Sequence, residues 1–157
     1  MRTSSSPFNK DADHSTLAKK GQEKNYSSAI DSIHIARACV HLGDLHETKG
    51  ELEKAVLAFN TSISHFESAI DTSPNSDKEV AGASQDVGVS LEEQNDRRLE
   101  ILFVLARLGG IYRRQGKISD ALDAYQLLRK RGEKDFGVQH PMVRLAKIST
   151  EMTRGYV

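Results

Sequence analysis

The segment Gly110–Lys117 (GIYRRQGK) is the first candidate for chemistry, because glycines followed by a lysine can wrap around a phosphate group. Its two glycines are one residue too far apart for a phosphate loop, and Ile118 stands where a hydroxyl side chain would hold the metal ion. The sequence therefore gives no reason to expect nucleotide binding.

Histidine and cysteine side chains are the next candidates. His34 and His41 lie on one predicted helix, about 10 Å apart along its axis, which is too far for one simple metal site. Cys39 is the only cysteine, so the chain cannot form an internal disulfide, and its apolar neighbours predict a buried, unreactive thiol. No nucleophile turn or paired-carboxylate site is recognisable. We predict a protein without a metal, a cofactor or an enzymatic activity.

Charge is balanced over the chain but not along it. The 22 Lys and Arg residues match 22 Asp and Glu residues, which argues against a dedicated nucleic-acid binder. Residues 71–96, however, hold seven acidic residues and one lysine, whereas residues 97–134 hold ten basic residues and four acidic ones. Without a long apolar run or an apolar leader at the start, we expect a cytoplasmic protein with no membrane span.

Helices must position any binding site in this chain. Apolar residues recur every three or four positions in four stretches, and a last helix is expected at 141–154. The four stretches begin at about Ser27, Leu52, Leu99 and Ile118. No segment alternates as a strand does, so we expect an all-α fold. Residues 1–24 are polar and predict a disordered tail, and residues 71–96 predict an acidic surface insertion.

Two segments of the chain carry the same residue types at the same spacing. The paired positions are Leu42 and Leu108, Gly43 and Gly109, Gly50 and Gly116, Ala55 and Ala121, and Phe59 and Tyr125, while His46 corresponds to Tyr112. The small residues let two helices approach closely, the turn glycines reverse the chain, and the aromatic rings fill the space beside the seam. We call the separation between Gly43 and Gly109 the repeat offset.

This pattern resembles the tetratricopeptide repeat, a helix-turn-helix unit with Leu-Gly, an aromatic residue, a turn glycine, Ala and Tyr or Phe at these offsets. The resemblance implies antiparallel helix pairs stacked as a short right-handed solenoid of about two repeats plus a C-terminal capping helix. The domain then covers residues 25–157, with repeat one at about 27–70, the acidic insertion at 71–96, repeat two at about 97–135 and the capping helix at about 141–154.

The end of the second copy looks like that of kinesin light chains. Gly137, His140 and Pro141 follow Ala121 at the spacing of that family's longer repeats, and the family binds cargo and adaptor peptides in a concave groove. The first copy lacks this ending, and the sequence also lacks the heptad coiled coil that joins light chains to a motor. A generic adaptor is therefore favoured over a true light chain.

The resemblance also implies a peptide-binding face, because the first helix of each tetratricopeptide pair lines the groove. The family's groove positions fall on Arg37, Val40, Asp44, Glu47 and Thr48, and then on Phe103, Ala106, Gly110, Arg113 and Arg114. In the second set Phe103 offers an apolar contact, Gly110 leaves room, and the two arginines can contact carboxylates or form a solvated face. We predict a scaffold that binds a protein or peptide partner, preferably an acidic one.

Two other roles stay open on the sequence alone. A structural subunit would use the repeat ends as its interface with a larger assembly. An RNA-binding repeat protein would use a basic patch made of Arg97, Arg98, Arg107, Lys130 and Arg131, although few aromatic residues lie among them. The charge asymmetry further suggests that the acidic insertion folds over the basic surface and competes with partners.

Overall fold

Five α-helices make up the described part of the chain. The computed structural model describes the backbone of residues 13–71 and 91–155, and side chains from residue 28 onward within those ranges. The helices are α1 (Asp13–Thr48), α2 (Leu52–Asp71), α3 (Leu91–Arg114), α4 (Ile118–Phe136) and α5 (Pro141–Arg154). These ranges contain no strand, which confirms the predicted all-α class.

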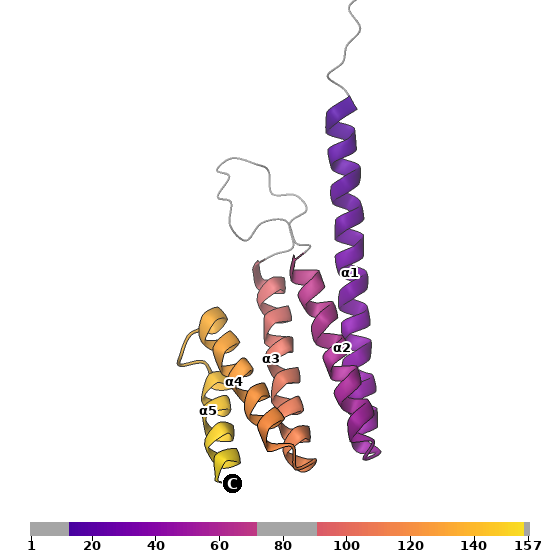
Figure 1. The fold of residues 1–157 in the computed structure, drawn as a ribbon. Coiled ribbons are helices and arrows are strands. Elements are labelled where there is room, and N and C mark those ends of the chain that lie inside the picture. Colours follow the sequence, from indigo (N-terminus) through magenta and orange to yellow (C-terminus); the bar gives the residue numbers. More distant parts are fainter. Residues whose placement is uncertain (1–12, 72–90, 156–157) are drawn as a thin grey trace, which may run out of the picture.

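The helices lie side by side in chain order, and each runs antiparallel to the next (Figure 1). Helix α1 is much longer than its neighbour α2 and extends beyond it at the N-terminal side. One end of the row is therefore α1, and the other end is α5. None of the described helices is long and apolar enough to cross a membrane.

Helix α1 begins at Asp13, well before the predicted start at about Ser27. Residues 13–24 are thus helical rather than part of a tail, and residues 1–12 lie outside the described residues. This stretch is rich in Leu, Ala, Lys, Gln and Glu, which are strong helix formers. Once a helix has been nucleated further along the chain, it extends through such residues at little cost, even where no apolar stripe reveals it.

Helix α3 also begins earlier than predicted, at Leu91, inside the stretch assigned to the insertion. Its first turns bury two polar residues, Gln94 and Arg97, and the Arg97 guanidinium donates to the main-chain oxygen of Ala69 at 3.3 Å. Polar residues at core positions conceal the helical period in the sequence. The rest of the predicted insertion, residues 72–90, and its suggested competition with partners lie outside the described residues.

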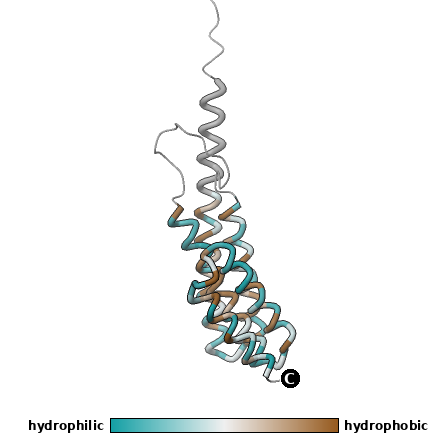
Figure 2. The backbone as a smooth tube through the Cα atoms, turned by 90° about the vertical axis from the view of Figure 1, so that its left-hand side faces the viewer, coloured by the Kyte–Doolittle hydropathy of each residue, from teal (hydrophilic) through white to brown (hydrophobic). Residues whose placement is uncertain are grey.

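The core lies between the helices and is built from one apolar side of each. Hydrophilic and hydrophobic residues are interspersed along the coloured parts of the helices in Figure 2, as expected for amphipathic helices. The large side chains with no solvent contact include Phe59 and Phe66 on α2, Leu102 and Ile111 on α3, and Leu128 on α4. Each buried aliphatic or aromatic side chain contributes about 1.5–3 kcal/mol, so this core holds the row of helices together.

The two helical turns have the same backbone geometry. Gly50 and Gly116 adopt φ values of 76° and 72°, a left-handed conformation that a side chain would strain. Main-chain hydrogen bonds around the first turn recur around the second at the repeat offset. In the first turn the amides of Gly50, Glu51 and Ala55 donate to the carbonyl oxygens of Glu47, His46 and Glu51. In the second turn the amides of Gly116, Lys117 and Ala121 donate in the same way to those of Arg113, Tyr112 and Lys117. The predicted correspondence between the two segments therefore holds in three dimensions.

Gly43 and Gly109 make the same close contact in both helix pairs. A Cβ atom built on Gly43 would lie 2.6 Å from Cε1 of Phe59, and one built on Gly109 would overlap the Tyr125 ring in the same way. The four partner positions on α2 and α4, namely Ala55, Phe59, Ala121 and Tyr125, are all buried. In both pairs the glycine thus lies against the aromatic ring of the opposite helix.

Leu42 departs from the predicted packing role. Its partner at the repeat offset, Leu108, is 2% exposed, whereas Leu42 is 47% exposed. Cys39, predicted to be buried, is likewise only partly buried. Leu108 lies on the side of α3 that packs against α2, whereas no described helix packs against the corresponding side of α1.

The turn before α5 is built by the residues that resemble the light-chain ending. Gly137 adopts a φ of 86°, and Pro141 occupies the first turn of α5. The His140 ring caps that helix, since its Nδ1 accepts a hydrogen bond from the Met142 amide at 3.3 Å, and it stacks on Phe136 with 4.9 Å between ring centroids. His140 therefore orders the turn between α4 and α5.

Candidate binding site between α1 and α3

A hollow of about 320 Å³ opens between α1 and α3. Val40, Phe103 and Val104 provide its apolar lining, and the remaining lining residues are Arg37, His41, Glu100 and Arg107. Phe103 is 53% exposed although it is aromatic. Three predicted groove residues, Arg37, Val40 and Phe103, are thus brought together from two helices that are far apart in the sequence.

An ion pair closes one end of the hollow. Arg37 on α1 donates to Oε1 of Glu100 on α3 through Nε at 3.1 Å and Nη2 at 2.8 Å. Hydrogen bonding to Glu100, together with the negative charge of that carboxylate, raises the pKa of the Arg37 guanidinium above its ordinary value. Glu100 was missed by sequence reasoning, although its place three residues before Phe103 puts it on the same face of α3.

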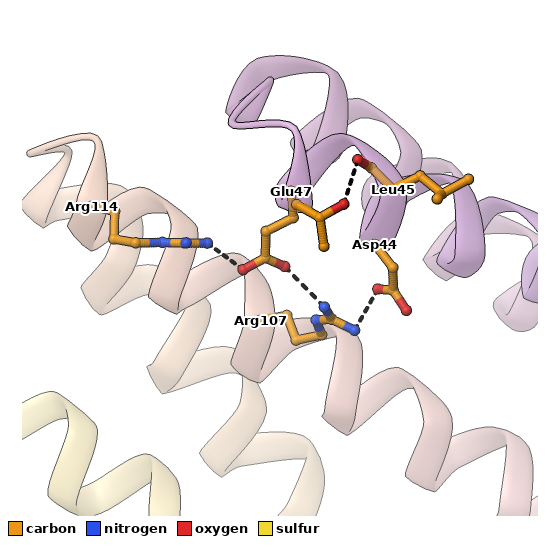
Figure 3. Close-up of polar contacts among 6 residues, drawn as sticks. Asp44, Leu45, Glu47, Arg107 and Arg114 are labelled. Atoms are coloured by element: carbon orange, nitrogen blue, oxygen red, sulfur yellow. Dashed lines mark hydrogen bonds and ion pairs between the residues drawn. The ribbon is translucent and has the colours of Figure 1, made fainter.

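A cluster of four charged residues closes the other end (Figure 3). Arg107 on α3 contacts Asp44 and also donates to Oε2 of Glu47 at 2.9 Å, and Arg114 contacts the second oxygen of Glu47. Both acidic residues belong to α1, so the cluster joins the two helices across the hollow. Thr48 is not part of it, because its hydroxyl donates to the main-chain oxygen of Leu45.

These contacts change the electrostatics expected for the site. Three guanidinium groups, on Arg37, Arg107 and Arg114, face three carboxylates, on Asp44, Glu47 and Glu100, so the formal charges of the rim cancel. The guanidinium of Arg114 is therefore already paired with a carboxylate of the protein, that of Glu47. Arg113 is half-buried, and no ion pair joins it to another described side chain.

The two small predicted groove residues behave differently. Ala106 packs against the core between the helices. Gly110 has open space on the side where a Cβ would point, with no atom within 4 Å, as expected for a position that leaves room for a ligand. Of these two, only Gly110 is suited to the role that the resemblance implies.

The residues proposed as a basic patch do not form one. Arg97 is buried against the end of α2, and Arg107 belongs to the cluster at the hollow. Arg131 on α4 donates to Oε1 of Glu67 on α2 at 2.5 Å. Five of the ten basic residues counted along 97–134 thus take part in contacts within the described fold, namely Arg97, Arg107, Arg114, Arg129 and Arg131.

A larger depression of about 770 Å³ lies between α4 and α5 and was not foreseen from the sequence. Charged residues line most of it, among them Arg129 and Glu133, which pair along α4 at 2.9 Å, and Lys147 on α5. Leu127 is the one apolar residue among its lining side chains, whereas Val40, Phe103 and Val104 line the smaller hollow between α1 and α3, which is therefore the better candidate.

In comparisons with known proteins, no family model matches the chain, and no curated protein or solved structure is significantly similar to it.

Proposed function

We propose that this protein is a non-enzymatic protein–protein interaction module that binds a peptide segment in the hollow between α1 and α3. The observation that carries this proposal is Phe103, an aromatic residue that is half-exposed in a hollow also lined by Val40 and Val104. We further propose that the two helix pairs form a short tetratricopeptide-like solenoid with α5 as its cap. The recurrence of turns and glycine contacts at the repeat offset supports this reading.

The dimensions and lining of the hollow favour an apolar anchor on the ligand. A space of about 320 Å³ is at the small end of ligand pockets and accommodates one or two side chains. Burying an aromatic or branched aliphatic side chain there contributes about 1.5–3 kcal/mol, which is enough to dominate a weak peptide contact. The ligand is thus a peptide with a Phe, Tyr, Leu or Ile anchor.

Acidic residues on the peptide play a secondary role in this proposal. A ligand carboxylate can replace Glu47 as the partner of Arg107 or Arg114, but such an exchange of exposed ion pairs gains little free energy. Arg113 makes no ion pair with a described side chain but is not among the residues that line the hollow. Acidic flanks therefore set the direction of the peptide, and affinity falls only modestly with salt.

Selection from a random peptide library against the full chain tests this proposal. Selected peptides should share an apolar anchor, and calorimetry should show binding at least about tenfold weaker to Phe103→Ser than to the unmodified protein. Leu145→Ser is the matched control, because Leu145 is also exposed but lies on α5. Failure to select any peptide, or equal binding to Phe103→Ser, would contradict the proposal.

A further inference from the structure

The outer side of α1 carries apolar residues that no described residue covers. Ile35 and Leu45 are 45% and 57% exposed, Leu42 is similarly exposed, and Ala38 is exposed as well. Their spacing of three, four and three residues places all four in one stripe along the helix, which we call the α1 stripe. On the opposite side of α1, Ala36 and Gly43 face α2.

The second helix pair shows what normally covers such a stripe. The residues at the repeat offset on α3 are Ile101, Val104, Leu108 and Ile111, and all four are buried. On this side α3 packs against α2, which runs antiparallel to it (Figure 1), and Arg97 reaches the Ala69 oxygen there. The same four positions thus lie in an interface between helices on α3 and in an open surface on α1.

The two ends of the α1 stripe carry opposite charges. Asp31 lies about one turn before Ile35, and Lys49 lies about one turn after Leu45, and both are exposed. Neither makes an ion pair with another side chain that the structure describes. The stripe is therefore apolar in its centre, negative at one end and positive at the other.

This order makes the α1 stripe complementary to itself when two copies run antiparallel. In that alignment Ile35 faces Leu45 of the second copy, Ala38 faces Leu42, and Asp31 faces Lys49. Each pair occurs twice because the arrangement has a two-fold axis. The spacing of three and four residues along the stripe is the spacing by which antiparallel helices pack side chains in successive layers. All apolar residues of the stripe meet apolar residues, and both charged ends meet an opposite charge.

We propose that the α1 stripe is a homodimer interface, in which α1 packs antiparallel against α1 of a second copy of this chain. The proposal does not rest on peptide binding, because Arg37 and Val40 line the hollow from another side of α1. The exposed Leu145, Ile148 and Met152 on α5 offer the alternative of a head-to-tail contact. That contact is not closed by symmetry and would produce chains of increasing length.

Sedimentation velocity of the full chain over a range of concentrations tests the dimer. A reversible monomer–dimer equilibrium is expected, and Leu42→Asp should weaken it at least about tenfold, because it places an unpaired charge at the centre of the interface. The matched control is Leu57→Asp on α2, which alters an equally apolar and more exposed position away from the stripe. Since both side chains are exposed, both variants should retain full helicity by circular dichroism.

A charge exchange tests the antiparallel register. Asp31→Lys alone and Lys49→Asp alone should each weaken the dimer about three- to tenfold, and the variant with both changes should restore it. Oxidation provides an independent readout, since Cys39 is the only cysteine and lies beside the stripe, near the expected two-fold axis. A disulfide-linked dimer should form in the unmodified protein and be lost in Leu42→Asp.

Three results would overturn the inference. They are a monomer at every concentration, a dimer that Leu42→Asp leaves intact, and a charge exchange that fails to restore association. Loss of self-association in Ile148→Asp but not in Leu42→Asp would instead establish the head-to-tail contact. None of these results depends on peptide binding, which is measured separately with Phe103→Ser.

Discussion

Gly43 lies against the ring of Phe59 so closely that a single added methyl group would overlap three ring carbons. The ring is fully buried and cannot turn away without disturbing the core. Gly43→Ala should therefore lower the free energy of unfolding by about 1–3 kcal/mol, the usual cost of overpacking, even though alanine favours helices more than glycine does. Urea denaturation followed by circular dichroism measures this change.

Gly110 provides the control for this prediction. It also lies within a helix, but a Cβ on Gly110 meets no atom within 4 Å. Gly110→Ala should thus stabilise the protein by up to about 1 kcal/mol through helix propensity alone. Equal effects of the two substitutions would mean that the contact between Gly43 and Phe59 is not a tight one.

Glu47 controls how many arginines at the groove are available to a ligand. It holds Arg107 and Arg114 at the same time, so Glu47→Gln should leave Arg114 without a charged partner and Arg107 with Asp44 alone. We expect acidic peptides to bind more tightly to this variant, with a steeper decrease in affinity as salt rises. Calorimetry at two or more salt concentrations, with acidic and neutral versions of one peptide, measures the effect.

Glu151→Gln is the matched control, because it makes the same change of charge on an exposed residue of α5, away from the groove. The stability of both variants should stay within about 1 kcal/mol of the unmodified protein, as is usual for ion pairs that are not fully buried. If Glu47→Gln and Glu151→Gln have the same effect on acidic peptides, the response reflects net charge rather than the cluster at the groove.

The fold could be predicted where apolar residues mark the helical period and glycines mark the turns. Gly50 and Gly116 locate two turns correctly because few other residues adopt a left-handed φ at low cost. The starts of α1 and α3 could not be found this way. In α3 two buried positions are occupied by Gln94 and Arg97, which carry no apolar signal, and Arg97 donates to the main-chain oxygen of Ala69.

Three of the predicted groove residues, Arg37, Val40 and Phe103, line the hollow, but the pairing of the charges around it could not be predicted. The repeat places Phe103 and Arg37 on the helices that line the hollow, because residue spacing determines the face of a helix. Which acidic residue neutralises which arginine depends on how α1 and α3 are placed relative to each other. Arg114 and Glu47 are 67 residues apart in the sequence, and only their approach in the fold shows that they pair.

His140 provides a test of the turn before α5. Its ring accepts a hydrogen bond from the Met142 amide and stacks on Phe136. His140→Ala removes both contacts and should destabilise the protein by about 0.5–2 kcal/mol, whereas His140→Asn restores the cap and should recover part of the loss. Urea denaturation of the two variants distinguishes them, and equal stabilities would show that the cap contributes nothing.

Glu51, at the turn between α1 and α2, gives a prediction about pH. A hydrogen bond from Lys54 and a second one with His46 favour its ionised form and lower the pKa of this carboxyl. Because that pKa is lower in the folded than in the unfolded chain, the carboxylate stabilises the fold at pH values above the ordinary pKa of glutamate. This contribution is lost as the pH falls through the lowered pKa of the folded state.

The measurement for Glu51 is a titration of its side-chain carboxyl by nuclear magnetic resonance. Lys54→Met removes the largest cause of the shift and should move the pKa of Glu51 back toward its ordinary value, while the remaining contact with His46 keeps it from returning completely. Lys130→Met is the control, since it removes the same charge from an exposed position on α4. An equal response to both substitutions would show that the overall charge of the protein, rather than the hydrogen bond from Lys54, sets this pKa.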